Sequence, residues 1–210
     1  MKIDQLILGA YETNCYILRS SEQVKDCLII DPGLEPGELI DFLQEHDLNP
    51  VAVLLTHGHI DHIAGLTELR DKYPDLKVYI HEQDAVMLAQ PFLNLSAMTG
   101  MAYETEPADF NLQENQQIDL AGIKLHVFHT PGHTPGGVCL YSEKDNVVFA
   151  GDTLFAGSVG RTDFPNGSMP QLINSIKQNL FTLPDTTKVY PGHGPVTSIA
   201  NEKKHNPFVR

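Results

Sequence analysis

Short apolar runs alternate with amphipathic stretches along most of the chain. The runs are bounded by Gly, Pro or Asp and have the length and composition of β-strands. We predict strands at residues 2–8, 14–18, 27–30, 51–55, 78–80, 123–129, 138–141, 147–150 and 188–190. Helical periodicity predicts helices at residues 36–45, 63–73, 82–88, 169–180 and 198–205.

This order of elements predicts an α/β protein in which two sheets carry helices on their outer faces. The segment 91–115 has weak periodicity and contains Met98, Met101 and Tyr103, so it is either an ordered flap or an irregular connection. No internal repeat and no low-complexity linker divides the chain. We therefore expect one domain over residues 1–210.

Composition narrows the classes of protein that fit. The formal net charge is -13, with 14 basic against 27 acidic residues, which opposes attraction to nucleic acid or to an anionic membrane. No run of about 18 apolar residues and no signal peptide is visible. Cys15, Cys27 and Cys139 lie far from one another in strand-like segments. We therefore expect them to be buried reduced thiols. We expect a cytoplasmic protein that acts on a small molecule.

Four potential metal ligands stand together in the stretch THGHIDH, directly after the apolar run 51–55. They are His57, His59, Asp61 and His62. Imidazole and carboxylate groups bind zinc and similar divalent cations, whereas a structural zinc site usually draws on cysteine thiolates. The stretch therefore predicts a reactive metal site in the loop that follows a buried strand.

Three more candidate ligands occupy the same kind of position, in a loop just past a predicted strand. His133 lies in HTPGHTPGG, Asp152 in AGDTLF and His193 in YPGHG. One such residue is commonly a turn cap, but the repetition favours convergence. Seven ligands suit two divalent cations about 3.5 to 4 Å apart, bridged by a carboxylate and a water-derived hydroxide. Zinc is the expected metal, and iron or manganese also fits such ligands.

These motifs, in this order, resemble those of metallo-β-lactamase-fold hydrolases, most of all the small glyoxalase II (hydroxyacylglutathione hydrolase) type. THGHIDH is similar to the family's H-x-H-x-D-H motif, and GHTPGG, GDTLF and PGHG are similar to its later ligand segments. The resemblance implies an αββα four-layer sandwich with the site at one rim. It also implies the ligand sets: His57, His59 and His133 for the first metal, Asp61, His62 and His193 for the second, and Asp152 between them.

The expected reaction is hydrolysis of S-lactoylglutathione or a similar acyl thioester. A thioester needs little acid assistance because its thiolate leaves readily, and two cations bring the pKa of a bound water to about 7. We expect Asp61 to orient the attacking oxygen. Arg161 stands near the bridging ligand and either grips a substrate carboxylate or pairs with Asp163. We expect no counterpart of the long C-terminal helical region with which larger glyoxalase II enzymes make further glutathione contacts.

A second reaction class fits part of the same pattern. Persulfide dioxygenases also resemble this chain, including the segment GRTDF at residues 160–164, and the resemblance implies one iron held by His57, His133 and Asp152. Such a set leaves coordination positions open for oxygen and substrate. Lactam hydrolysis is less favoured, because Asp152 stands where many zinc β-lactamases have a cysteine.

The other histidines and strand-end acids are assigned simpler roles. We expect His46, His81 and His205 to face solvent beside helices, and at most one of His126 and His129 to look toward the site. Asp31 in IIDPG either caps its turn or orients a ligating histidine, the first being the simpler account. Phe164, Tyr190 and the methionines near residue 100 line a pocket or belong to the core.

Overall fold

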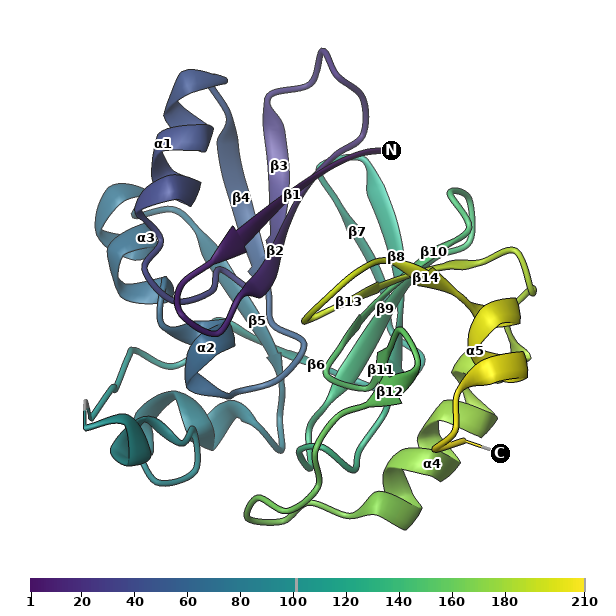
Figure 1. Ribbon diagram of the computed structural model, residues 1–210. Coiled ribbons are helices and arrows are strands. Elements are labelled where there is room, and N and C mark those ends of the chain that lie inside the picture. Colours follow the sequence, from purple (N-terminus) through teal and green to yellow (C-terminus); the bar gives the residue numbers. More distant parts are fainter. Residues whose placement is uncertain (101, 210) are drawn as a thin grey trace.

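Two mixed six-stranded sheets face each other in the computed structural model, which describes residues 1–100 and 102–209. Figure 1 shows the first sheet with the N-terminal half of the chain and the second with the C-terminal half. In the first sheet the order is β1 (Lys2–Leu8), β2 (Thr13–Arg19), β3 (Asp26–Ile30), β4 (Asn49–Leu54), β5 (Lys77–His81) and β6 (Phe110–Leu112).

The second sheet is built mainly from antiparallel neighbours. Its order is β14 (Thr197–Ser198), β13 (Lys188–Pro191), β10 (Val147–Gly151), β9 (Val138–Ser142), β8 (Ile123–His129) and β7 (Gln117–Leu120). A separate small hairpin consists of β11 (Leu154–Phe155) and β12 (Ser158–Val159). Among the described strands of this sheet, β10 and β13 form the parallel pair.

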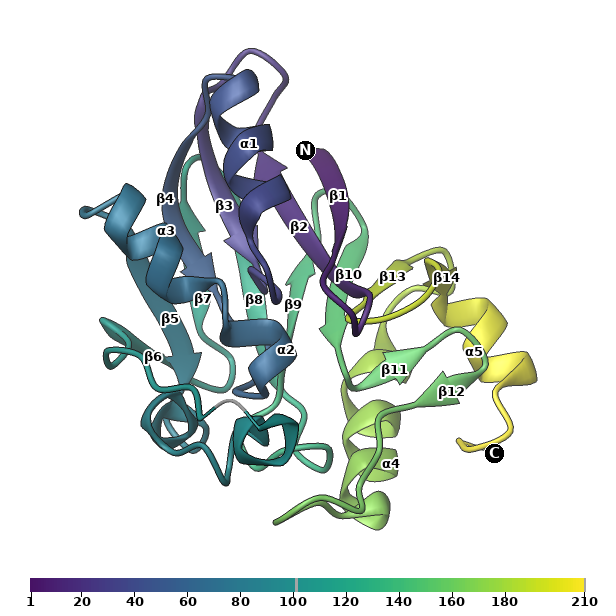
Figure 2. The same ribbon diagram turned by 60° about the vertical axis from the view of Figure 1, so that its left-hand side comes forward.

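Helices cover the outer face of each sheet. Figures 1 and 2 show α1 (Gly37–Glu45) and α3 (Leu66–Lys72) beside the first sheet, and α4 (Met169–Gln178) and α5 (Ile199–His205) beside the second. The predicted αββα sandwich is therefore confirmed. No helix in residues 1–100 and 102–209 has the length and apolar character needed to cross a membrane.

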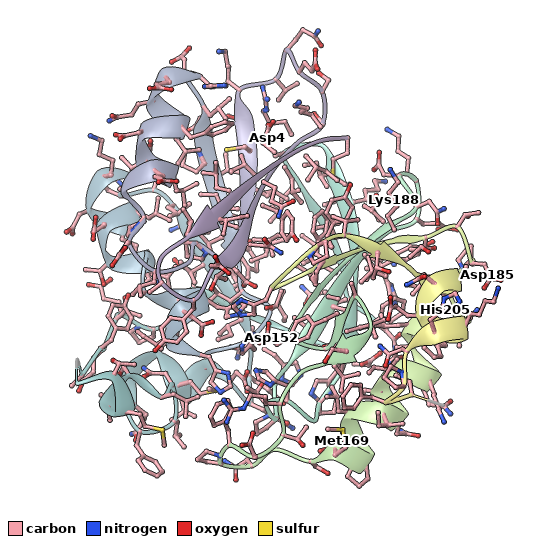
Figure 3. The ribbon with its side chains drawn as sticks, in the orientation of Figure 1. Asp4, Asp152, Met169, Asp185, Lys188 and His205 are labelled. Atoms are coloured by element: carbon pink, nitrogen blue, oxygen red, sulfur yellow. The ribbon has the colours of Figure 1, made fainter. Side chains whose placement is uncertain are left out.

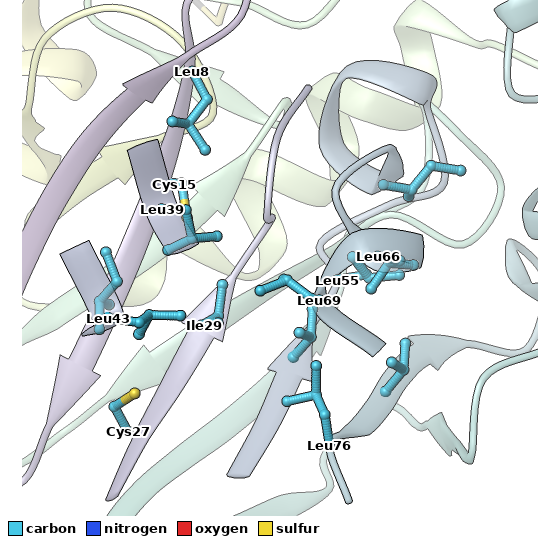
Figure 4. Close-up of a cluster of buried hydrophobic side chains, with 14 of the residues drawn as sticks. Leu8, Cys15, Cys27, Ile29, Leu39, Leu43, Leu55, Leu66, Leu69 and Leu76 are labelled. Carbon is cyan, nitrogen blue, oxygen red and sulfur yellow. The ribbon is translucent and has the colours of Figure 1, made fainter. Parts of the chain in front are cut away.

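Alternating side chains bury both faces of the sheets. Ile17 and Ile29 point to the helix side, where they pack in one cluster with Leu69 of α3. Figure 4 shows Ile29 and Leu69 in this cluster. Their chain neighbours Leu18 and Ile30 point the other way and pack against the second sheet. Because successive side chains of a strand face opposite ways, continuous apolar runs are needed for strands covered on both sides. This is why the strand runs in the sequence are so uniformly apolar.

Strand direction brings the loop residues of the site to one edge. In the first sheet β3 and β4 are parallel. In the second, β8 and β10 are both antiparallel to β9, and β13 is parallel to β10. The three strands β8, β10 and β13 therefore end at the same edge. A bridge between Thr13 and His193 joins the two sheets there.

The helix predicted at residues 63–73 is in fact two helices, α2 (Ile60–Ile63) and α3. They are interrupted at Gly65, whose N–H donates to the Gly33 carbonyl 2.8 Å away instead of continuing the helical ladder. The earlier start means that Asp61 and His62 lie on a helical turn and not in a loop.

The prediction of a solvent-facing His81 is wrong, and the helix predicted at residues 82–88 is a shorter 3-10 helix. His81 ends β5, is 5% exposed and stacks on His129 with ring centroids 4.0 Å apart. A short 3-10 helix, η1 (Ala85–Ala89), follows after a turn. The local pattern of apolar residues did not reveal that a strand from the other sheet supplies the covering ring.

The segment 91–115 is ordered where it is described. It contains η2 (Ser96–Thr99) and the edge strand β6, while Met101 lies outside the described residues. The prediction also missed β7, β11, β12, β14 and a third short 3-10 helix, η3 (Leu180–Thr182). These pieces are too short to carry a hydrophobic period. The three cysteines are buried and free, as predicted.

Candidate metal centre

The first part of the site follows directly from the end of β4. His57 and His59 come after that strand, and the next residues turn into α2, which carries Asp61 and His62. His57, His59 and His62 are at most 5% exposed. Four metal-binding side chains are thus packed into one buried turn between strand and helix.

Three imidazoles form the first group, which we call the histidine triad: His57, His59 and His133. One ring nitrogen of each lies within 4.8 Å of the others. His133 reaches the group from the second sheet, with its Nε2 at 2.9 Å from Nδ1 of His59. Its Nδ1 lies 2.6 Å from the Arg161 carbonyl. Because that carbonyl accepts a hydrogen bond from the protonated Nδ1, Nε2 keeps a free lone pair for a cation.

Asp61, His62 and His193 form the second group, which we call the mixed triad. Their ligand atoms also lie within 4.8 Å of one another. His62 directs its Nδ1 to the Asp31 carboxylate at 2.8 Å, and His193 directs its Nδ1 to the Tyr11 carbonyl at 3.0 Å. In both rings an oxygen partner fixes the proton on Nδ1 and leaves Nε2 bare, the state that a ligating histidine needs.

Asp152 lies between the two triads. Its Oδ2 is 3.5 Å from Nε2 of His133, and its Oδ1 is 3.5 Å from Nε2 of His62 and 3.6 Å from Nε2 of His193. Figure 3 shows the residue at the centre of the molecule between the two sheets. One carboxylate thus faces both groups, as a bridging ligand must.

Two buried polar atoms at this point have no hydrogen-bond partner within the described chain. They are Nε2 of His57 and Oδ1 of Asp152. A buried polar atom without a partner is costly, by roughly 1–3 kcal/mol, and it is unusual in a folded protein. A cation next to each atom removes this cost. The donor set, the fixed tautomers and these orphaned atoms therefore fit two divalent cations.

The two triads differ in charge. Burial, followed by the neighbouring imidazoles, lowers the pKa of His57 and of His59 well below the usual value. Burial also acts to lower the pKa of His62, but Asp61, Asp31 and Asp152 outweigh it and raise that pKa well above the usual value. The lowered pKa values keep the His57 and His59 rings uncharged, whereas the carboxylates around His62 favour positive charge at the mixed triad, which a cation can supply.

A cavity of about 450 Å³ opens onto the site. Besides the candidate ligands, Arg161 and Thr99 line it. Most of its wall is apolar or aromatic, from Tyr11, Ile60, Leu95, Met98, Phe155 and Phe164. The segment 91–115 thus supplies part of the wall. Tyr190 instead packs in the core, with its ring 5.5 Å from that of Tyr16.

Arg161 reaches the cavity but is already paired. Its Nε and Nη2 donate to the two oxygens of Asp163 at 3.0 and 2.8 Å, and its guanidinium lies 4.3 Å from the centre of the Phe164 ring. The structure thus shows the internal pair with Asp163, and the grip of Arg161 on a substrate carboxylate stays a prediction.

Sequence reasoning missed several residues that hold the ligands. Asp31 does not merely cap its turn: it accepts hydrogen bonds from Thr56 as well as from His62. The sequence contained a signal for this role, because Asp31 stands at the end of a buried strand, where an acid can orient a ligating histidine. Tyr11 and Thr13 gave no signal. Tyr11 acts through its carbonyl, and Thr13 donates to Asp61 at 3.3 Å through a contact that only folding creates.

The family model of the metallo-beta-lactamase superfamily matches residues 8–193. The chain therefore belongs to the metallo-beta-lactamase superfamily. Among its relatives, "Probable metallo-hydrolase YqgX" of Bacillus subtilis is 40% identical over 100% of this chain and 98% of its own length. "Hydroxyacylglutathione hydrolase GloC" of Haemophilus influenzae is 35% identical over the same shares.

Solved structures agree with this assignment. The "BLEG-1 B3 metallo-beta-lactamase" superposes with a TM-score of 0.94 at 40% identity, covering 99% of each chain. "TTHA1623 in a di-iron-bound form" gives 0.86 at 37% identity, covering 98% of this chain and 99% of that one. "ETHE1 from Myxococcus xanthus" gives 0.81 at 32% identity, covering 99% and 84%. By its family, the chain is thus a metal-dependent hydrolase. The titles of its relatives differ from one another in the activity that they name.

Proposed function

We propose that this protein hydrolyses acyl thioesters of the glyoxalase II type, with S-lactoylglutathione as the model substrate. The observation that carries the proposal is the placement of Asp152 between two triads of bare ligand atoms, at the mouth of a cavity large enough for a small substrate. The relative titled hydroxyacylglutathione hydrolase supports this choice of substrate.

His57, His59 and His133 would hold one cation, Asp61, His62 and His193 the second, and Asp152 both. Bound there, divalent cations acidify water and polarise the carbonyl that it attacks. The chain's own residues fix the ligand tautomers, through Asp31, the Arg161 carbonyl and the Tyr11 carbonyl. None of the three cysteines is placed to act as a nucleophile, because all three are buried in the core.

Asp61 is the residue that we assign to orienting the attacking water. Its Oδ2 is 3.2 Å from Nε2 of His193 and accepts a hydrogen bond from Thr13, so one oxygen is held in place. The carboxylate also lines the cavity. We expect Asp61→Asn to keep part of its metal and lose most of its turnover. Unchanged turnover in that variant would remove the role.

The central test is an assay of purified protein under argon, with S-lactoylglutathione as substrate and metal analysis of the same sample. We expect about two divalent ions per chain and thiol release without oxygen. Treatment with a chelator should abolish the activity, and added zinc, manganese or iron should restore it. Absence of thiol release from metal-loaded protein contradicts the proposal.

A second candidate is an iron-dependent persulfide dioxygenase that uses His57, His133 and Asp152. The specific observation in its favour is that the two orphaned buried atoms belong to His57 and Asp152, two of these three residues. The same samples distinguish the candidates. Oxygen uptake with glutathione persulfide, together with one iron per chain, would favour the dioxygenase over the hydrolase.

The similarity to a structure titled as a B3 metallo-beta-lactamase adds a third substrate to the assay. A chromogenic cephalosporin tests lactam cleavage by the same site. We expect the thioester to be cleaved with a kcat/KM well above that of the lactam. The reverse ranking would replace the thioester by a cyclic amide as the proposed substrate.

A further inference from the structure

A buried acid outside the predicted ligand set joins the two loops that build the histidine triad. Asp84 follows β5 and is 0% exposed. Its Oδ2 accepts hydrogen bonds from the Gly58 N–H at 3.2 Å and from the Thr134 hydroxyl at 2.7 Å. Its Oδ1 accepts one from the Gly136 N–H at 2.6 Å. Gly58 lies between two ligands of the first sheet, and Thr134 follows the one ligand that the second sheet contributes to the triad.

The side chain is turned away from its own helix. Asp84 stands at the N-cap position of η1, where an aspartate usually accepts a hydrogen bond from the helix N-terminus, yet it makes no such side-chain bond. Both oxygens are instead used on the two ligand loops. Each of its three partners is uncharged, so the contact is directional hydrogen bonding and not an ion pair.

Two glycines allow this close approach. A Cβ at Gly136 would lie 2.6 Å from the Asp84 nitrogen and 2.7 Å from its Oδ1. A Cβ at Gly58 would lie 2.6 Å from Cβ of Met87 in η1. Any larger residue at either position would push its loop off the acid. Gly58 in THGHIDH and Gly136 in GHTPGG thus share one physical reason, which is contact with the segment that begins at Asp84.

We propose that Asp84 is a positioning residue that sets the separation of His57 and His59 from His133, and thereby the affinity of the histidine triad for its cation. This inference rests on the proposed metal site. Without the carboxylate, the loops are held by fewer hydrogen bonds, and the three imidazoles lose more conformational freedom on binding a cation. Groups that orient ligands in this way typically change metal affinity by about 10–100-fold.

The test compares Asp84→Asn with wild type. An asparagine keeps the shape, but its single carbonyl oxygen can satisfy only one side, and its NH₂ group faces an N–H donor on the other. We expect zinc affinity, measured by competition with a chromophoric chelator, to fall about 10–100-fold for one of two sites. The d–d spectrum of the cobalt-loaded protein should change, which a purely structural role would not produce.

Glu202→Gln is the matched control. Glu202 is 1% exposed and its carboxylate also accepts hydrogen bonds, from Gly157, Thr197, Asn201 and Asn206, at a place away from the triads. We expect it to lower the melting temperature while leaving zinc affinity and the cobalt spectrum unchanged. If Glu202→Gln weakens zinc binding as much as Asp84→Asn does, general destabilisation explains the effect and the inference is overturned.

A second pair of variants covers the case in which Asp84→Asn does not fold. Thr134→Val removes one of the three hydrogen bonds, and Thr134→Ser keeps it. We expect the valine variant to bind zinc several-fold more weakly and the serine variant to match wild type; equal affinities in both would overturn the inference. Zinc binding by wild type itself is the separate check, because wild type that binds no zinc refutes the proposed function and not merely the role of Asp84.

Discussion

The two sheets contribute to the site in different ways. The first sheet supplies four candidate ligands from one continuous stretch, where β4 passes into α2. The second supplies one ligand from each of three strand ends, after β8, β10 and β13. A motif confined to one turn is held by local backbone geometry, whereas three separate loops depend on strand direction and on contacts across the molecule. Damage to the second set should therefore be harder to compensate.

The sharpest way to break this comparison is to remove the one ligand of the second sheet that faces both triads. Asp152→Asn keeps the shape but loses the charge and one of the two oxygens, of which Oδ1 faces His62 and Oδ2 faces His133. We expect thioester hydrolysis to fall by at least about 100-fold and the metal content to drop below that of wild type. Asp185→Asn, at an exposed pair with Lys203, serves as control and should change neither quantity.

The next variant tests whether the continuous motif is truly self-sufficient. Asp31 follows β3 and fixes the proton on Nδ1 of His62. In Asp31→Asn the single amide oxygen cannot accept hydrogen bonds from both the Thr56 N–H and Nδ1 of His62, which use different oxygens of the aspartate. We therefore expect zinc affinity to weaken by about 10–100-fold at the mixed triad. Chelator competition measures this, with Asp119→Asn on the exposed edge strand β7 as the neutral comparison. Wild-type affinity would mean that the local turn suffices by itself.

A smaller effect is expected at the contact between the two sheets, where His81 of β5 stacks on His129 of β8. Burial, followed by the neighbouring His129, lowers the pKa of His81 to about 4. The folded value lies below the unfolded one of about 6.5. The neutral ring thus stabilises the fold above pH 6.5, and this contribution is lost as the pH falls toward 4.

We therefore expect His81→Phe, which cannot titrate, to lose less stability than wild type on acidification. The difference should be on the order of 2 kcal/mol between pH 7 and pH 4. Urea unfolding of both proteins after chelator treatment measures it, because the other titrating groups are common to the two. Parallel pH profiles for the two proteins would contradict a lowered pKa at His81.

The smallest effect concerns the rim of the cavity. Asp163→Asn releases Arg161 from its exposed pair, so the guanidinium becomes available to a substrate carboxylate. We expect kcat/KM to rise roughly two- to fivefold, as suits an exposed ion pair, for a thioester of a carboxylate-bearing thiol. A thioester of an uncharged thiol provides the control and should be unaffected. An equal rise for both substrates would exclude charge recognition by Arg161.

Much of the candidate site was predicted from the sequence. The seven predicted ligands come together in the structure. They could be recognised in the sequence because each motif places histidine or aspartate side chains directly after an apolar run. The role of Asp84 was not predicted, since nothing in HEQDAVML marks an acid whose partners are 26 and 50 or more residues away. The helix predicted at 82–88 is shorter and of the 3-10 type, and the Asp84 side chain at its start is held by tertiary contacts.

The order of apolar runs and of ligand-bearing turns is written in the sequence, because each run must be apolar on both faces and each ligand type must match its cation. The register that brings His133, Asp152 and His193 to the edge shared with His57 is a property of folded sheets alone. The same holds for the proton positions on the histidines, which depend on distant carbonyls and carboxylates. Chain order specifies which groups are present, and packing decides which atoms of those groups stay free to bind.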